Sequence, residues 1–158
     1  MCPIKLLILN LKSKWKATVL FIAYFSFISF LSFVGISIFF KERLHGNYIE
    51  ASHNFIPFST IGMYFLNFGS YNFYTWFYNT LGNILLFIPF GMFLALFFPK
   101  VTRVWAIIII LLFSFLIEAM QLISHLGVFD VDDIILKTVG GFLGFLIFNL
   151  LNRTKINE

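Results

Sequence analysis

The chain has 158 residues and a formal net charge of +4, and 60% of its residues are hydrophobic, 21% aromatic and 11% charged. Because a soluble domain carries about 25% charged residues, this composition excludes an ordinary water-soluble globule and indicates a single all-α membrane domain over residues 1–158. One cysteine, Cys2, excludes an intrachain disulfide and a cysteine-based metal site.

Four apolar runs along the chain predict membrane helices, which need about 20 residues each. The first run, residues 17–40, is uncharged. It is longer than the apolar core of a cleaved signal peptide, which is about 7–15 residues, so we expect an uncleaved helix. The other runs cover about residues 81–98, 104–126 and 134–151. The predicted fold is a polytopic helical membrane protein with four spans.

The distribution of Lys and Arg predicts the orientation, because cytoplasmic loops hold the excess of these residues. Most of the 11 basic residues fall on the cytoplasmic side if both termini lie in the cytoplasm, and most of the 7 acids then fall outside. This topology accounts for the basic composition. We therefore expect membrane lipids as partners and no nucleic acid.

Residues 41–80 form the long segment between the first two predicted spans, and its second half is rich in aromatic side chains. Tyr and Trp concentrate at membrane–water interfaces. We expect this segment on the outer surface, partly as a short interfacial helix. Two interpretations stay open: a plain anchoring belt, or a platform for an aromatic or glycosylated ligand.

A polar stripe interrupts the third predicted span. Its members are separated by 4, 3 and 4 positions, which places them on one face of a helix: Ser114, Glu118, Gln121 and His125. Lipid offers no hydrogen-bond partners, so the stripe should face other helices or a wet cavity. Glu118 is a candidate functional residue, because an ionisable group is costly in hydrocarbon.

Further polar residues should lie at the same outer level as this stripe. The predicted topology brings the start of the second span and the acids before the fourth span close to Glu118. We therefore predict an outward-facing polar pocket, with the candidate residues Asn83, Glu118, Gln121, His125, Asp130, Asp132 and Asp133.

Several chemistries fit such a pocket. The carboxylates Asp130, Asp132 and Asp133 could bind a hard divalent cation, and the pocket could supply acid–base groups for a reaction on a lipid headgroup. No catalytic residue and no cofactor is assigned from the residues alone. The structural alternative is that Glu118 and the amides cross-link helices while the aspartates cap the fourth helix.

The fourth predicted span contains a small-residue face and a lysine. Gly140, Gly141 and Gly144 have the spacing that lets helices approach closely, which indicates internal packing, with a homo-oligomer as the alternative. Lys137 either extends toward the outer headgroups or pairs with one of the aspartates.

Four sequence segments, taken together and in order, point to a known family. They are Asn54-Phe-Ile-Pro-Phe58, Asn83-Ile-Leu-Leu-Phe-Ile-Pro-Phe-Gly91, Glu118-Ala-Met-Gln121 and the run from Phe129 to Gly144. In these segments, over about residues 54–151, the chain resembles the VanZ-like membrane proteins. The family's recurrent polar positions carry over onto Asn83, Glu118, Gln121, Asp130, Asp132 and Asp133.

The resemblance implies a small multi-pass protein of the bacterial cytoplasmic membrane, mostly in Gram-positive bacteria, linked to low-level resistance to the glycopeptide teicoplanin. A lipid-linked cell-wall precursor or a glycopeptide is then the expected partner. Two alternatives are a membrane-embedded enzyme acting on a lipid or lipid-linked precursor headgroup, and a small cation- or proton-coupled transporter.

The chain departs from the family pattern at two positions. Gly127 stands where the family commonly has an Arg, and Lys137 where it commonly has an Asn. If that Arg pairs with Glu118 or an aspartate in the family, Lys137 could supply the positive charge here instead.

Overall fold

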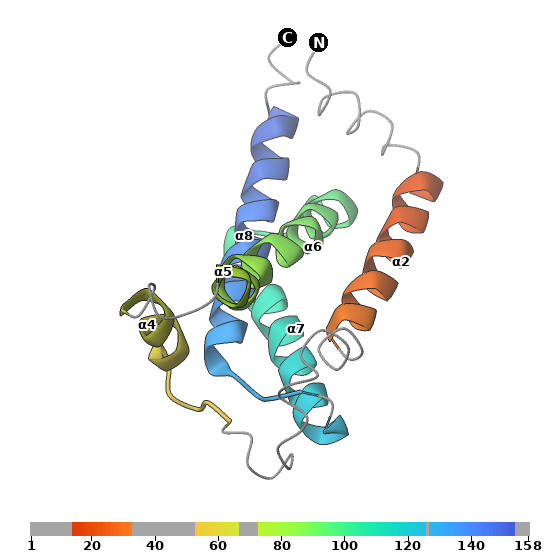
Figure 1. Cartoon of the computed structure of the whole chain (residues 1–158). Coiled ribbons are helices and arrows are strands. Elements are labelled where there is room, and N and C mark those ends of the chain that lie inside the picture. The colour runs from red at the N-terminus through yellow and green to blue at the C-terminus, as the bar shows by residue number, and fades with distance from the viewer. Residues whose placement is uncertain (1–13, 33–52, 67–72, 126, 154–158) are drawn as a thin grey trace.

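The computed structural model describes residues 14–32, 53–66, 73–125 and 127–153 of the chain. The named elements in these ranges are all helices (Figure 1). Extended backbone pairs there in an isolated bridge between Asn54 and Asp130. The all-α class predicted from composition is therefore confirmed.

The helical elements of the described ranges, in chain order, are α2 (Lys14–Phe30), α4 (Ser59–Leu66), α5 (Phe73–Phe77), the π-helical turn η5 (Tyr78–Gly82), α6 (Asn83–Phe97), α7 (Arg103–Ser124) and α8 (Val131–Arg153). α5, η5 and α6 follow one another without a break, so the helix of the second predicted span begins earlier than expected. α8 also begins earlier, at Val131, and its first turn therefore includes two of the acids predicted to lie in a loop.

Within the part of the chain that the structure describes, three helices are long and apolar enough to cross a membrane: Asn79–Phe97, Arg103–Ser124 and Val131–Asn152. The helical part of the first predicted span, Trp15–Phe30, is apolar but shorter. The remainder of that span beyond residue 32, and the aromatic segment's residues 41–52 and 67–72, lie outside the described residues. The fourth span and the sidedness of the termini stay predictions.

α6 and α8 make the closest helix–helix contact. A Cβ atom at Gly140 would lie 2.1 Å from the carbonyl oxygen of Ile84, and one at Gly144 would lie 1.9 Å from that of Ile88. The two backbones therefore touch where only glycine fits. Since these contacts advance in the same direction along both helices, α6 and α8 run parallel to each other.

α7 packs against the same pair of helices in the opposite direction. A Cβ atom at Gly141 would lie 2.6 Å from Cγ2 of Ile110, so the glycine face of α8 also admits α7. Stacked rings of Phe90 and Phe113, with centroids 4.4 Å apart, join α6 to α7. Phe87 and Ile110 are fully buried between the helices.

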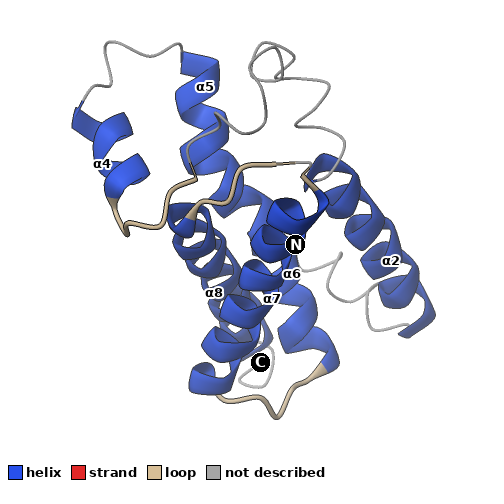
Figure 2. Cartoon of the chain, turned by 90° about the horizontal axis from the view of Figure 1, so that it is seen from below, coloured by secondary structure: helices blue, strands red, loops and turns tan. Residues whose placement is uncertain are grey.

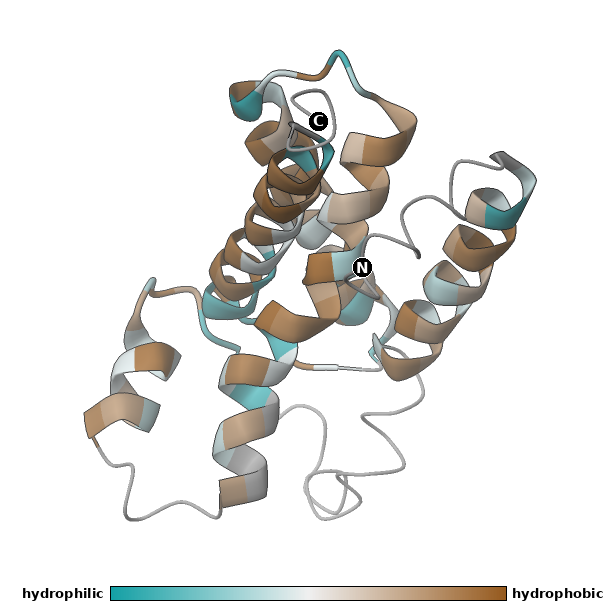
Figure 3. Cartoon of the chain, turned by 90° about the horizontal axis from the view of Figure 1, so that it is seen from above, coloured by the Kyte–Doolittle hydropathy of each residue, from teal (hydrophilic) through white to brown (hydrophobic). Residues whose placement is uncertain are grey.

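α2 and α4 flank this three-helix unit. Figures 1 and 2 both show α2 on one side of the unit and α4 on the other. The Tyr24 hydroxyl of α2 donates to the carbonyl oxygen of Leu86 at 2.7 Å. Hydrophobic positions dominate the helices in Figure 3, and the outer face of α7 exposes residues such as Leu112 and Leu116. An apolar outer face of this kind is suited to lipid.

Candidate functional site

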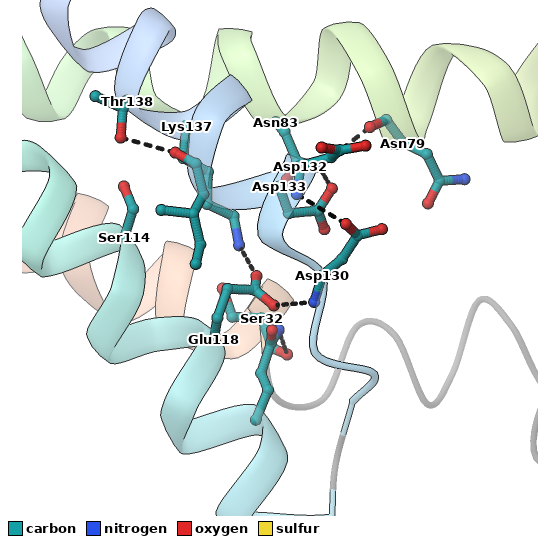
Figure 4. A network of polar contacts seen from close by, with 12 residues as sticks. Ser32, Asn79, Asn83, Ser114, Glu118, Asp130, Asp132, Asp133, Lys137 and Thr138 are labelled. Carbon is teal, nitrogen blue, oxygen red and sulfur yellow. Dashed lines mark hydrogen bonds and ion pairs between the residues drawn. The ribbon is translucent and has the colours of Figure 1, made fainter. Parts of the chain in front are cut away.

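Polar side chains from α6, α7, α8 and the turn before α8 meet near the N-terminal ends of α6 and α8 (Figure 4). Asn54, which precedes α4, and Thr60 of α4 join them through hydrogen bonds to Asp130. We call this set the polar cluster. Its members are Asn54, Thr60, Asn83, Glu118, Asp130, Asp132, Asp133 and Lys137.

A buried ion pair forms the centre of the polar cluster. The Lys137 ammonium of α8 donates to Oε1 of Glu118 on α7. Glu118 is 0% exposed and Lys137 5% exposed, so both charges are removed from solvent. The Lys137 Nζ atom also lies 6.0 Å from the centre of the Phe87 ring. Lys137 therefore turns into the helix unit toward Glu118 rather than toward the outer headgroups. It supplies the positive charge beside Glu118, as the comparison with the family pattern suggested.

The second oxygen of Glu118 connects α7 to the start of α8. Oε2 accepts a hydrogen bond from the backbone N–H of Asp130 at 3.2 Å. Glu118 lies well before the end of α7, so α8 begins beside the body of α7 rather than at its end. The acids of the turn consequently lie next to Glu118, inside the helix assembly.

Asp130 joins three segments of the chain. Its Oδ1 accepts from the backbone N–H of Asp132 at 2.8 Å, which is the N-cap interaction for α8. The same oxygen accepts from Nδ2 of Asn54 at 2.8 Å, and Oδ2 accepts from the Thr60 hydroxyl at 2.7 Å. Asp130 therefore caps α8 and also holds the segment that leads into α4.

Asp132 caps a helix that lies far away in the sequence. Its Oδ1 accepts from the backbone N–H of Phe58 at 2.5 Å and its Oδ2 from that of Ile61 at 2.9 Å. These donors lie at the N-terminal end of α4, where the helix itself offers them no acceptor. Asp132 is 0% exposed. Its carboxylate also lies at the positive end of the α4 dipole, where a negative charge is stabilising.

Asp133 and Asn83 connect α8 to α6. Nδ2 of Asn83 donates to Oδ1 of Asp133 at 2.7 Å, and to the carbonyl oxygen of Asn79 at 3.2 Å. Asn79 lies in η5, the π-helical turn that leads into α6. π-Helical turns often occur at functional positions.

The other residues of the predicted stripe lie at different levels of α7. Ser114 is buried and donates to the carbonyl oxygen of Ile110 in its own helix. Gln121 is buried and its Nε2 donates to the carbonyl oxygen of Ser32 at 2.8 Å. His125 is exposed and ends α7 with a left-handed backbone at φ 56°. The structure thus brings Glu118 together with the aspartates and Asn83 but places His125 at the surface.

Residues 53–58 form the part of the site that sequence reasoning missed. The backbone N–H of Asn54 donates to the carbonyl oxygen of Phe129 at 2.9 Å. In return, the backbone N–H of Val131 donates to the carbonyl oxygen of Asn54 at 3.1 Å. The rings of Phe55 and Phe129 stack with centroids 5.2 Å apart. Asn54 is the first residue of one of the four family-like segments. Membership of that segment was the feature of the sequence from which its role could have been predicted.

The polar cluster is rich in acid, with four carboxylates and one ammonium group. Backbone N–H groups, amides and a hydroxyl supply the remaining donors to Asp130, Asp132 and Asp133. Within the described residues, no group of three or more His, Cys, Asp or Glu side chains is arranged to hold a metal ion. The geometry suits the joining of chain segments, because the carboxylate oxygens accept hydrogen bonds from the chain itself.

This arrangement occurs in a chain with clear relatives. A family model described as VanZ/LLP1 matches residues 18–152, which include most of α2 as well as the polar cluster. The chain belongs to the VanZ/LLP1 family. The match extends further toward the N-terminus than residue 54, where the resemblance read from the sequence begins.

One relative within the VanZ/LLP1 family is the protein VanZ of Enterococcus faecium. It is 32% identical to this chain over 107 residues, a stretch that covers 68% of this chain and 58% of that protein. The chain therefore aligns with somewhat more than half of the length of that relative. No solved structure matches this chain.

Proposed function

We propose that this VanZ/LLP1-family protein is a multi-pass protein of the bacterial cell membrane that lowers susceptibility to glycopeptide antibiotics such as teicoplanin. Family membership and the similarity to VanZ support this function. The three long apolar helices support a membrane location. A lipid-linked cell-wall precursor or the glycopeptide is the ligand class that fits this function.

The observation that carries the proposal is the buried Glu118–Lys137 ion pair together with the aspartates around it. Removing ionised groups from water is costly, so ionisable residues within membrane proteins usually mark functional positions. Here the charges hold residues 53–66, which are rich in aromatic side chains, against the first turn of α8. The proposed role of the polar cluster is to fix that segment in the position from which it acts.

The fixed segment is suited to contact with a ligand. Phe55 and Phe58 expose most of their ring surface, although the backbone beside them is held by Asn54 and Asp132. A rigid backbone that displays aromatic rings loses little conformational entropy when it binds. Charged members of the polar cluster then act as positioning residues, because their side chains are occupied with the chain itself.

The test is expression in a glycopeptide-susceptible host, with wild type and variants present at equal membrane levels. We expect wild type to raise the teicoplanin inhibitory concentration and Glu118→Gln to reduce that increase, since the neutral amide leaves Lys137 buried without its counter-charge. Ile123→Ala, which changes an exposed side chain on the same helix, serves as the matched control. An unchanged inhibitory concentration with well-expressed wild type contradicts the proposal.

A further inference from the structure

We propose that residues 53–66 lie inside the bilayer, in the leaflet that surrounds the C-terminal half of α7, and that their exposed apolar side chains contact lipid acyl chains. This places the segment at a greater depth than the membrane surface on which the sequence alone predicts it. The proposal concerns the position of the segment. At this depth, the ligand class that Phe55 and Phe58 can contact under the proposed function is the lipid-linked precursor, whose lipid part lies in the same leaflet.

The depth follows from the level at which α8 begins. Ser124, the last residue of α7, lies six residues after Glu118, and six residues of helix rise about 9 Å. The Asp130 N–H contacts Glu118, so α8 starts at about the level of Glu118. Figure 1 shows the last turns of α7 extending past the first turn of α8. If α7 spans the bilayer, the start of α8 is below the membrane surface.

α4 begins at the same depth as α8. Both backbone donors at its N-terminal end, those of Phe58 and Ile61, bind Asp132 in the first turn of α8. Asn54 pairs through its backbone with Phe129 and Val131, which flank Asp130. The segment is therefore fixed beside the buried part of the polar cluster.

The composition of the segment suits a lipid environment. Between Glu50 and Lys100 the sequence has no Asp, Glu, Lys or Arg. Charged side chains are what make insertion into hydrocarbon costly. Residues 53–66 therefore carry no Asp, Glu, Lys or Arg that must reach water, and Nδ1 of His53, the imidazole of the segment, accepts a hydrogen bond from the backbone N–H of Phe129 at 3.2 Å.

The non-helical backbone of the segment has partners supplied by the protein. Irregular backbone occurs at membrane depth only where protein satisfies its polar groups. The N–H of Phe58 binds Asp132, and the N–H of Ile56 binds Oδ1 of Asn54 at 3.0 Å. Phe58 itself adopts a left-handed backbone with φ 65°, which a non-glycine residue adopts at a cost.

The most exposed side chains of the segment are apolar, like those on the outward face of α7. Ile56 is 69% exposed and Leu66 86% exposed, and Phe58 and Phe65 are also largely exposed. Outward-facing Ile123 of α7 is 77% exposed. An uncharged apolar surface of this kind fits acyl chains as its partner, as the outward face of α7 does.

Spin labels report this depth directly. Cys2 is replaced by Ser, and single cysteines are introduced as Ile56→Cys and Leu66→Cys in the full chain, reconstituted in phospholipid bilayers. Each label is then tested for collision with oxygen, which concentrates in hydrocarbon, and with a water-soluble nickel chelate. Leu112→Cys on the outer face of α7 is the lipid-facing control, and Lys100→Cys in the α6–α7 turn is the water-facing control.

We expect the oxygen-to-nickel collision ratios at positions 56 and 66 to approach that of Leu112→Cys and to exceed that of Lys100→Cys severalfold. Ratios equal to that of Lys100→Cys at both positions overturn the proposal and place the segment in water. Low collision with both reagents also overturns it, because the surface is then covered by protein, such as a second copy of the chain. The two positions serve as independent variants if one label disturbs the fold.

Discussion

Replacing Lys137 by Met provides a quantitative test of the buried ion pair. The Lys137 ammonium is the cationic group in the polar cluster, and Glu118 is fully buried beside it. Lys137→Met keeps a long apolar side chain but leaves the carboxylate without its counter-charge. Breaking a buried pair by removing one partner costs about 3–5 kcal/mol. We expect a loss of this size in the free energy of unfolding.

The double variant separates the ion pair from the rest of the packing. Glu118→Gln combined with Lys137→Met removes both charges, and replacing both partners of a buried pair is often close to neutral. The double variant should therefore be more stable than Lys137→Met alone. Lys100→Met, at an exposed lysine in the α6–α7 turn, is the matched control and should change stability by at most about 0.5 kcal/mol.

The assay is reversible unfolding in mixed micelles, followed by helical circular dichroism. Wild type, Glu118→Gln, Lys137→Met, the double variant and Lys100→Met are measured under the same conditions. A double-mutant cycle gives the coupling between positions 118 and 137. Additive effects, or a loss below about 1 kcal/mol for Lys137→Met, would refute a stabilising buried pair between Glu118 and Lys137.

Further variants test the contacts that hold the helices and α4. Gly144→Ala should destabilise the protein by about 1–3 kcal/mol, because its Cβ would meet the Ile88 carbonyl oxygen at 1.9 Å. Gly62→Ala in α4 should be neutral or stabilising by up to about 1 kcal/mol, since no atom lies within 4 Å of the added Cβ. Both are measured in the same unfolding assay, and equal effects contradict the described packing. Tyr24→Phe should lower stability by about 0.5–1.5 kcal/mol through loss of its hydrogen bond to α6, and no change in that assay argues against docking of α2 at this place. Asp132→Ala should increase hydrogen exchange at the N–H of Ile61 while exchange in the middle of α8 stays unchanged, and equal exchange at Ile61 in both proteins rules out this cap.

Helical periodicity located the main polar residues correctly along α7. Ser114, Glu118 and Gln121 are all buried, as a polar stripe facing other helices requires. The period could not show where the helix ends, and His125 lies just beyond α7 with a left-handed backbone. A residue in that conformation leaves the face that the pattern assigns to it.

The long-range partners of the acids could not be read from periodicity. Asp132 lies next to a predicted helix start, where a local cap is the simplest expectation. Its carboxylate instead caps α4, which is 71 residues away at Ile61. The pairing of Lys137 with Glu118 also depends on how α7 and α8 are set against each other, and the glycine contacts fix that packing.

The measurement that tests the proposed function most directly is the teicoplanin inhibitory concentration of cells expressing Asp132→Ala or Gly62→Ala at equal membrane levels. Both substitutions affect α4, but only the first removes its cap from α8. We predict that Gly62→Ala keeps the increase conferred by wild type and that Asp132→Ala loses most of it. Full activity of Asp132→Ala would contradict a role for the polar cluster in positioning residues 53–66.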